Sequence, residues 1–130
     1  MTIMKMKNLV INSTNKTPKI DFNAEIGIIE IKGVSIAEDA NKFYSPLIDW
    51  AERYVKTTDL FLTTIKIKII YFNTSTSNYL INFLKTFKKL EDKVSIEWYY
   101  ETEDDDMKET GTHFENILEM KFHYIEVDEI

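Results

Sequence analysis

Apolar and polar residues alternate along the predicted strands of this chain, and this alternation limits the folds open to it. The most strongly predicted strand, Leu62 to Phe72, alternates isoleucine with lysine from Ile65 to Ile69. The predicted strands Val94 to Tyr100 and Met120 to Val127 also place large apolar residues on one parity and charged or polar residues on the other. A sheet covered by helices on both faces would instead carry continuous apolar runs. The alternation therefore predicts a half-buried sheet with helices mainly on one face.

The remaining segments complete a regular order of strands and helices. Shorter extended segments are predicted at Leu9–Ile11, Lys19–Phe22 and Gly27–Lys32. Apolar residues recur at helical spacing from Ala40 to Val55, from about Ser77 to Glu91 and, more weakly, through Phe114, Ile117 and Leu118. Three strands are thus followed by helices and strands in alternation. This order predicts a single α/β domain over residues 1–130, with a mixed sheet.

Two details of this pattern leave alternatives open. Ser45 and Pro46 could start the first helix, with the serine as N-cap and the proline at the first helical position. Alternatively, Pro46 lies inside a longer helix and kinks it. The end of the main strand, Ile69 to Phe72, is continuously apolar and so departs from the alternation of its first half.

Composition excludes several classes of function. The chain contains no cysteine, which excludes disulfides, thiolate chemistry and cysteine-ligated zinc. Its formal net charge of −6 disfavours nucleic-acid or anionic-membrane binding, because a polyphosphate repels an acidic protein. The segment Met1 to Asn8 has no apolar signal-peptide core, and no apolar run is long enough to span a bilayer. We therefore expect a cytoplasmic protein that binds neither nucleic acid nor membrane.

No residue set in the sequence indicates a catalytic, metal or cofactor site. His113 and His123 do not have a metal-binding spacing. The acidic run Glu101 to Asp106 lacks the alternating ligands and the glycine of an EF-hand loop. Such a run is typical of a solvated loop or of a first helical turn, and it also suits contact with a basic partner. We therefore predict no enzyme activity, no catalytic residue, no metal and no cofactor.

Six small polar residues lie between the main strand and the second helix, in the run Asn73-Thr74-Ser75-Thr76-Ser77-Asn78. The simplest interpretation is helix capping, in which these side chains accept hydrogen bonds from the unpaired amides of the first turn. The same helix end would stabilise a phosphate, because it presents N–H groups and the positive end of the helix dipole. Phosphorylation there would add about −1.5 to −2 charges and confront a docked partner with a bulky dianion. The local pattern is compatible with both roles.

A series of short motifs runs through nearly the whole chain. They are Thr17-Pro18 with Ile20-Asp21-Phe22, Gly27 to Gly33, Phe43-Tyr44, Asp49-Trp50, Tyr71 to Ser75, Trp98 to Tyr100, and Asp104 to Met107 with Gly111. No one of these motifs is specific. In their order and spacing together, they resemble the SiaC-type family of bacterial regulatory phosphoproteins.

This resemblance implies a fold similar to anti-sigma-factor antagonists (STAS-like folds) and a protein without chemistry of its own. In the family, the threonine of the Asn-Thr-Ser turn is phosphorylated by a cognate kinase and dephosphorylated by a PP2C-like phosphatase. Thr74 is the matching position, and Asn73 and Ser75 complete the switch turn. The unphosphorylated form of one member binds and activates a diguanylate cyclase. The resemblance thus implies a kinase, a phosphatase and a diguanylate cyclase as partners, and a link to cyclic-di-GMP signalling.

One stretch departs from the family pattern. The family's Ser-x-Pro-Glu-Asn reads Ser35-Ile36-Ala37-Glu38-Asp39 here, so that Ala37 replaces the proline. Asp39 can still cap the following helix, and we expect the fold to survive. A partner surface built on this turn is expected to differ from that of the family. The predicted partner surface comprises Ser35, Glu38, Asp39, Asp104, Asp105 and Asp106.

Two other classes of function are compatible with the sequence. The chain could be a constitutive structural or scaffold protein in which the turn acts only as a helix cap. It could also be a small-ligand-binding or enzymatic domain that uses the exposed face of the sheet. Partner binding that is insensitive to phosphatase would favour the first class, and saturable heat on titration with nucleotides or divalent metals would favour the second.

Overall fold

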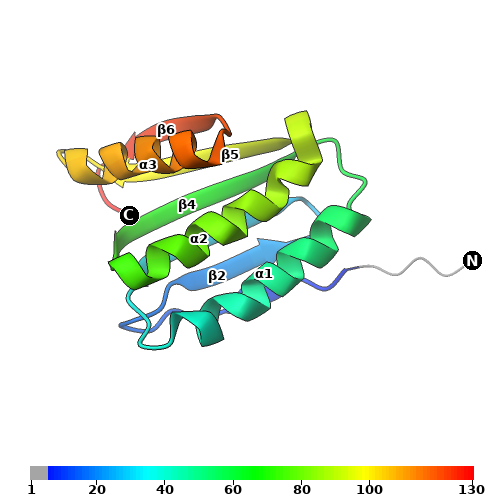
Figure 1. The fold of residues 1–130 in the computed structure, drawn as a ribbon, viewed down its shortest axis with the longest axis horizontal. Coiled ribbons are helices and arrows are strands. Elements are labelled where there is room, and N and C mark those ends of the chain that lie inside the picture. Colours follow the sequence, from blue (N-terminus) through cyan, green and yellow to red (C-terminus); the bar gives the residue numbers. More distant parts are fainter. Residues whose placement is uncertain (1–5) are drawn as a thin grey trace, which may run out of the picture.

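The computed structural model describes residues 6–130, in which one sheet of six strands carries three α-helices on a single face (Figure 1). The strands are β1 (Leu9–Ile11), β2 (Lys19–Asn23), β3 (Ile28–Ser35), β4 (Thr63–Phe72), β5 (Val94–Glu101) and β6 (Phe122–Val127). The helices are α1 (Ala40–Thr57), α2 (Thr74–Thr86) and α3 (Asp105–Leu118), and a 3-10 segment η1 (Phe87–Lys93) follows α2.

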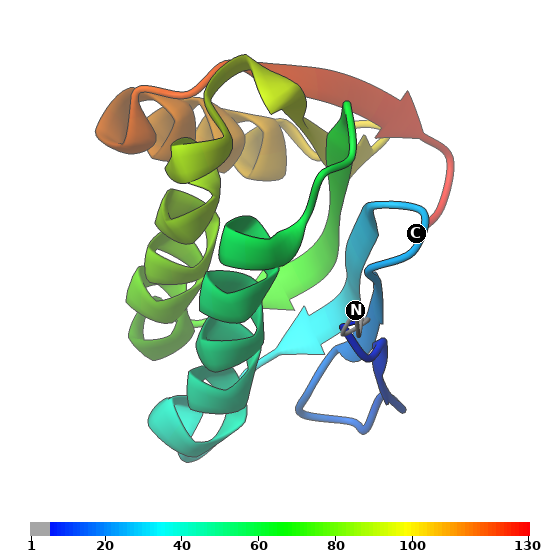
Figure 2. The same ribbon diagram turned by 90° about the vertical axis from the view of Figure 1, so that its right-hand side faces the viewer.

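The topology explains why all three α-helices share one face. The strands lie across the sheet in chain order; β1, β2 and β3 pair antiparallel, whereas β3 to β6 pair parallel. Each parallel neighbour needs a crossover, and α1, α2 and α3 supply the three crossovers. Right-handed crossovers that always advance in one direction place their helices on the same side. Figure 2 shows the helices on one side and the sheet on the other. The predicted α/β fold is confirmed, and the similarity to anti-sigma-factor antagonists stays a prediction.

The alternation of β4 follows the two faces of the sheet until a bulge interrupts it. Ile65, Ile67 and Ile69 are buried under the helices, and the lysines between them lie on the open face. Gly33 of β3 pairs with Ile69 but Val34 pairs with Tyr71, so Ile70 is an extra residue. As a result, Ile70 and Tyr71 are both exposed on the open face, while Phe72 packs against Phe114 of α3. The bulge explains the unbroken apolar run at the end of this strand.

The start of α1 decides between the two alternatives for the first helix. The helix begins at Ala40, and Asp39 is its N-cap, with a carboxylate oxygen that accepts from the Lys42 amide at 3.0 Å. Pro46 therefore lies inside the longer helix, and Ser45 is not its cap. The prediction that Asp39 caps this helix in place of asparagine is confirmed. The prediction that the second helix starts near Ser77 is wrong, because α2 already begins at Thr74.

The core between the helices and the sheet is rich in aromatic rings. Trp98 of β5 is fully buried in this core. Its ring contacts those of Phe114 and Phe122, and the ring centroids are 5.2 and 5.7 Å away. Gly111 of α3 allows this close packing, since a Cβ atom there would lie 2.7 Å from the Trp98 ring. The Trp98 indole also donates to the Met107 carbonyl at 3.0 Å. These contacts fix α3 to the sheet.

Candidate functional site

The N-termini of all three α-helices lie at the end of the sheet where strands β3 to β5 finish (left in Figure 1). This follows from the topology, because each helix starts directly after a parallel strand. The N-caps are Asp39 for α1, Asn73 for α2 and Asp104 for α3. The predicted switch turn is therefore placed between two other helix starts, both of which carry a carboxylate cap.

Asn73 holds the turn in place through its side chain and its backbone. Its Oδ1 atom accepts from the Thr76 amide at 3.2 Å and from the Ser75 hydroxyl at 3.0 Å. Its backbone amide donates to the Ser35 carbonyl at 3.3 Å, which ties the turn to the end of β3. The capping role expected from the sequence is thus present in the structure, and Asn73 performs it.

A buried relay of hydroxyl groups supports the turn from below. Thr76 is 1% exposed and donates from its hydroxyl to the Ser35 carbonyl at 2.9 Å. The Ser35 hydroxyl is hydrogen-bonded to the Tyr44 hydroxyl of α1 at 2.6 Å, and the Tyr44 ring stacks on Tyr79 of α2. Burial raises the pKa of Tyr44 to about 12. The relay joins β3, α1 and α2 directly beneath the turn.

The four hydroxyls at the start of α2 differ sharply in their surroundings. Thr76 is buried, Ser75 donates to Asn73, and the Ser77 hydroxyl donates to the Thr74 carbonyl at 2.8 Å. Thr74 is exposed, and its hydroxyl makes no hydrogen bond to any residue in the described range 6–130. Of these hydroxyls, that of Thr74 is the one most available to an enzyme, because it takes no part in holding the fold.

The residues predicted as a partner surface fall into two groups. Glu38, Asp39, Asp105 and Asp106 are exposed, and Asp104 is half-buried as the cap of α3. They lie at the same end of the sheet as Thr74. Ser35 does not belong to this surface, which corrects the prediction. Its side chain is 1% exposed, because β3 buries it under α1 and α2 against Tyr44.

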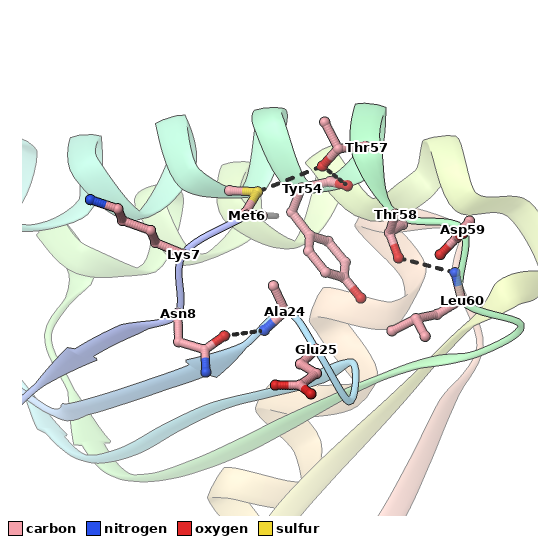
Figure 3. A pocket seen from close by; sticks show the side chains of 10 residues that line it. All are labelled: Met6, Lys7, Asn8, Ala24, Glu25, Tyr54, Thr57, Thr58, Asp59 and Leu60. Atoms are coloured by element: carbon pink, nitrogen blue, oxygen red, sulfur yellow. Dashed lines mark hydrogen bonds between the residues drawn. The ribbon is translucent and has the colours of Figure 1, made fainter. Parts of the chain in front are cut away.

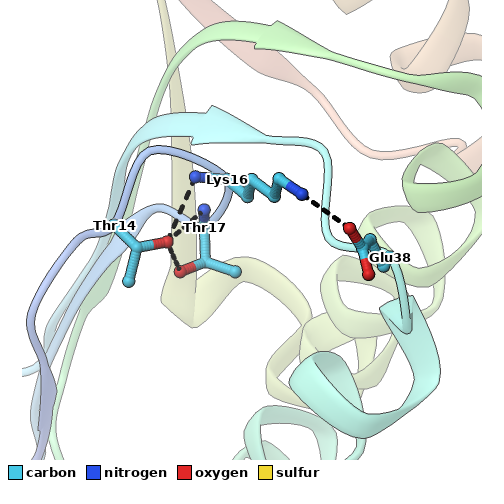
Figure 4. A network of polar contacts seen from close by, with 4 residues as sticks. All are labelled: Thr14, Lys16, Thr17 and Glu38. Atoms are coloured by element: carbon cyan, nitrogen blue, oxygen red, sulfur yellow. Dashed lines mark hydrogen bonds and ion pairs between the residues drawn. The ribbon is translucent and has the colours of Figure 1, made fainter.

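The stretch that departs from the family pattern is held by a neighbouring loop (Figure 4). The Ile36 amide donates to the Lys16 carbonyl at 2.9 Å, and the Lys16 ammonium pairs with Glu38 at 2.6 Å. The hydrogen bond from Lys16 and its charge lower the pKa of Glu38. Thr14 fixes the loop by accepting from the backbone amides of Lys16 and Thr17. These contacts order the stretch around Ala37.

A cavity of about 480 Å³ lies at the opposite end of β4, beside the last turn of α1 (Figure 3). Its lining includes Met6, Tyr54, Thr57, Thr58 and Leu60. The Tyr54 hydroxyl is bonded to Thr63, and the Thr58 hydroxyl accepts from the Leu60 amide, so these polar groups have partners within the fold. No sequence motif predicted this cavity, because its lining comes from the N-terminal segment, the β2–β3 turn and the end of α1.

The two histidines do not form a metal site in the described part of the chain. His113 and His123 are both exposed, and residues 6–130 contain no group of three or more histidine or acidic side chains placed to hold a metal ion. Among those residues, no helix combines the length and apolar character needed to span a membrane. The bulge at Ile70 and Tyr71 was missed by sequence reasoning, although the broken alternation at this point was its signal.

One family model matches most of this chain. The family model described as SiaC family regulatory phosphoprotein matches residues 11–127. An uncharacterized protein of Pseudomonas aeruginosa strain UCBPP-PA14 is 25% identical over 112 residues, which cover 84% of this chain and 88% of that protein.

Solved structures share the fold along almost the whole chain. SiaC of Pseudomonas aeruginosa matches with a TM-score of 0.76 at 23% identity, covering 94% of this chain and 100% of that one. Apo-SiaC from the same species matches with a TM-score of 0.77 at 22% identity, over 93% and 98%. The crystal structure of the diguanylate cyclase SiaD in complex with its activator SiaC gives a TM-score of 0.79 at 22% identity, over 91% and 97%.

Proposed function

Because this chain belongs to the SiaC family of regulatory phosphoproteins, we propose that it is a non-enzymatic protein-interaction switch whose regulated residue is Thr74. A cognate kinase phosphorylates Thr74 in the cytoplasm, and a PP2C-like phosphatase resets it. The unphosphorylated form binds a downstream signalling partner. SiaC of Pseudomonas aeruginosa is described as the activator of a diguanylate cyclase, and a cyclase of this class is the partner we propose here.

The observation that carries this proposal is the availability of the Thr74 hydroxyl. The side chain is exposed at the first position of α2, and its hydroxyl has no hydrogen bond within residues 6–130. The neighbouring hydroxyl of Thr76 is buried, and that of Ser75 is bonded to Asn73. A kinase can thus reach Thr74 without opening the turn, since Asn73 and Thr76 hold it.

The electrostatics of α2 also suit a phosphate at this position. The first turn contains no acidic residue, and the N-cap is the neutral Asn73. A phosphate on Thr74 therefore meets the positive end of the helix dipole without repulsion from a carboxylate in the same turn. We expect the modification to change the surface charge while the helix stays folded.

Phosphosite mapping tests the assignment. The chain is purified from its native host and treated with the kinase and ATP, and intact-mass and peptide mass spectrometry then locate the phosphate. We expect a single phosphate on Thr74 and none on the Thr74→Ala variant. Phosphate found only on Ser75, Thr76 or another residue would contradict the site.

The capping bonds of Asn73 and Thr76 favour one alternative, a constitutive scaffold in which the turn serves the fold alone. The stability of Thr74→Ala separates the two functions. The Thr74 hydroxyl forms no bond within the described residues, so the switch proposal expects an almost unchanged free energy of unfolding. A large loss of stability, together with partner binding that is insensitive to phosphatase, would support the scaffold.

A further inference from the structure

Within residues 6–130, no helix covers the face of the sheet opposite α1, α2 and α3 across the parallel strands β3 to β6. The chain end does contact this face at the end of β5, where the Ile130 amide donates to the Glu101 side chain at 3.1 Å. Figure 2 shows all three α-helices of the described chain on the other side. Parallel strands are ordinarily covered on both faces, since their crossovers supply helices to each side. A parallel face without helices is therefore a candidate surface for a partner, and its residues indicate which partner it fits.

Three lysines form a row across this open face. Lys19 of β2 pairs in register with Lys32 of β3, which pairs with Lys68 of β4. Like charges directly opposite one another on the same face repel and destabilise the sheet. Lys68 is compensated by Glu30 at 3.6 Å and by the Tyr99 ring at 4.7 Å. Lys19 and Lys32 are exposed and form no ion pair with any residue from 6 to 130.

An exposed apolar group adjoins this row on the side of the switch turn. The bulge places Ile70 and Tyr71 together opposite Val34, and they are 40% and 58% exposed. Val34 lies two residues beyond Lys32 on the same face of β3. Asp21 and Glu30 also lie on this face, each two residues along the strand from Lys19 and Lys32, respectively. Lysines and exposed apolar side chains thus share one surface in a protein that has 22 acidic and 16 basic residues.

We propose that this lysine–bulge surface, formed by Lys19, Lys32, Val34, Ile70 and Tyr71, docks an acidic protein segment with apolar anchors. Carboxylates of the partner pair with Lys19 and Lys32, and its apolar side chains cover the bulge. Lys19 and Lys32, which are exposed and without an ion-pair partner within residues 6–130, attract carboxylates, in contrast to the acidic surface around Asp105. The inference rests on the proposed function in taking this segment to belong to the downstream partner of the switch.

The position of the surface gives phosphorylation a direct effect on docking. Tyr71 precedes Thr74 by three residues, so their Cα atoms lie at most about 11 Å apart. This separation is close to the screening length of about 8 Å at physiological salt. A phosphate on Thr74 therefore repels an acidic segment bound at Tyr71. The proposed sign of the switch, with binding by the unphosphorylated form, follows from this repulsion.

Site-specific photo-crosslinking in the native host tests the proposal. The photoreactive residue p-benzoylphenylalanine replaces Tyr71 in one strain and, as a matched control, Phe61 in another, because Phe61 is 89% exposed at the opposite end of the sheet. We expect an adduct from position 71 whose partner peptide has a net negative charge and apolar residues. We expect the yield to fall at least tenfold when Thr74→Asp is added.

The variant Lys32→Glu separates docking from folding. It replaces the central lysine of the row, so the melting temperature should rise or stay equal while the adduct yield falls at least tenfold. Lys88→Glu, in the exposed η1 segment, serves as the charge-matched control and should leave the yield unchanged. An adduct peptide that is basic, an adduct from position 61 alone, no adduct from position 71, or an unaffected yield in Lys32→Glu would overturn the proposal.

The outcome also separates this inference from the proposed function. If Thr74 is phosphorylated but phosphorylation does not change the adduct at position 71, the docking surface is wrong and the phosphosite stands. If an acidic peptide is crosslinked at position 71 and no phosphate is found on Thr74, the surface stands and the switch is wrong.

Discussion

The starts of α2 and α3 are built alike but charged differently. Each helix follows a parallel strand, and each N-cap side chain accepts from the amide three residues on: Asn73 from Thr76 at 3.2 Å and Asp104 from Met107 at 3.1 Å. The α3 cap is a carboxylate, and its first turn also contains Asp105 and Asp106. The first turn of α2 has no acidic residue, and its cap is neutral.

This contrast in charge indicates which helix start can respond to a modification. At α3, permanent carboxylates already interact with the positive end of the dipole, so further negative charge there meets repulsion. The first turn of α2 carries no negative charge at the positive end of its dipole, and the exposed hydroxyl of Thr74 lies in this turn. The two helices also pack differently: the middle of α3 packs against Trp98 at Gly111, whereas the start of α2 lies on the hydroxyl relay beneath Thr76.

The largest effect is expected where α3 is packed most tightly. In Gly111→Ala the new methyl group would lie 2.7 Å from the buried Trp98 ring. Alanine is the better helix former by about 1 kcal/mol, so a net loss of stability isolates the steric clash. We expect the free energy of unfolding to fall by about 3 kcal/mol in chemical denaturation. Thr112→Ala, at the exposed neighbouring position, should change it little, and an equal loss in both variants would contradict the packing argument.

The hydroxyl relay beneath α2 should lose its stabilising effect at alkaline pH. Burial raises the pKa of Tyr44 to about 12 in the folded state, against about 10 when it is unfolded. The unfolded chain releases this proton first, so stability is intact below pH 10 and is lost as the pH rises towards 12. At about 1.4 kcal/mol per pKa unit, this group accounts for a loss of up to about 2.7 kcal/mol.

Denaturation curves measured across this pH range check the assignment to Tyr44. Tyr44→Phe should remove its part of the alkaline loss. Tyr99 provides the matched control, because burial and then Glu97 raise its pKa to about 12 on the open face, away from the relay. If Tyr99→Phe removed the whole loss and Tyr44→Phe none of it, the relay would have no role in the alkaline transition.

The buried hydroxyl of Thr76 should contribute more to stability than its exposed neighbour. Thr76→Val keeps the shape of the side chain but removes the hydrogen bond to the Ser35 carbonyl. We expect a loss of about 1.5 kcal/mol in the free energy of unfolding. Ser75→Ala removes an exposed hydroxyl and should cost less than about 0.5 kcal/mol. Equal losses in thermal or chemical denaturation would show that the turn does not depend on its buried side.

The smallest effect comes from giving α2 the charge that α3 already has. Asparagine and aspartate cap helices about equally well, so Asn73→Asp changes mainly the charge. We expect the free energy of unfolding to rise by about 0.5 kcal/mol at low salt, and Asp104→Asn to lower it by a similar amount. Both changes in the free energy of unfolding should become smaller in high salt, as measured by calorimetry. A loss of stability in Asn73→Asp would mean that the start of α2 does not accept negative charge.

The sequence was sufficient for the architecture because the relevant signals are local and periodic. Alternation in the strands and the 3.6-residue period in the helices predict which side of each element is buried, and chain order limits the topology. Ser45 and Pro46 left the start of α1 undecided, since a proline fits both the first turn and a kink. The structure decides in favour of the longer helix, because Asp39 is its N-cap.

Other features depend on contacts between distant parts of the chain. Ser35 was predicted on a partner surface, but its partner Tyr44 comes from another element and buries it. The row of lysines needs the register of β2, β3 and β4, which no single strand specifies. Likewise, the six polar residues before α2 look equivalent in sequence, and their packing makes Thr76 structural while leaving Thr74 free.

The most direct test of the switch compares one preparation before and after phosphorylation at Thr74. Calorimetry gives the melting temperature of each form, and titration gives the affinity of each form for the downstream partner. We predict an equal or slightly higher melting temperature for the phosphorylated form and an affinity that is lower by roughly tenfold or more. A marked drop in melting temperature, or an unchanged affinity, would contradict the account.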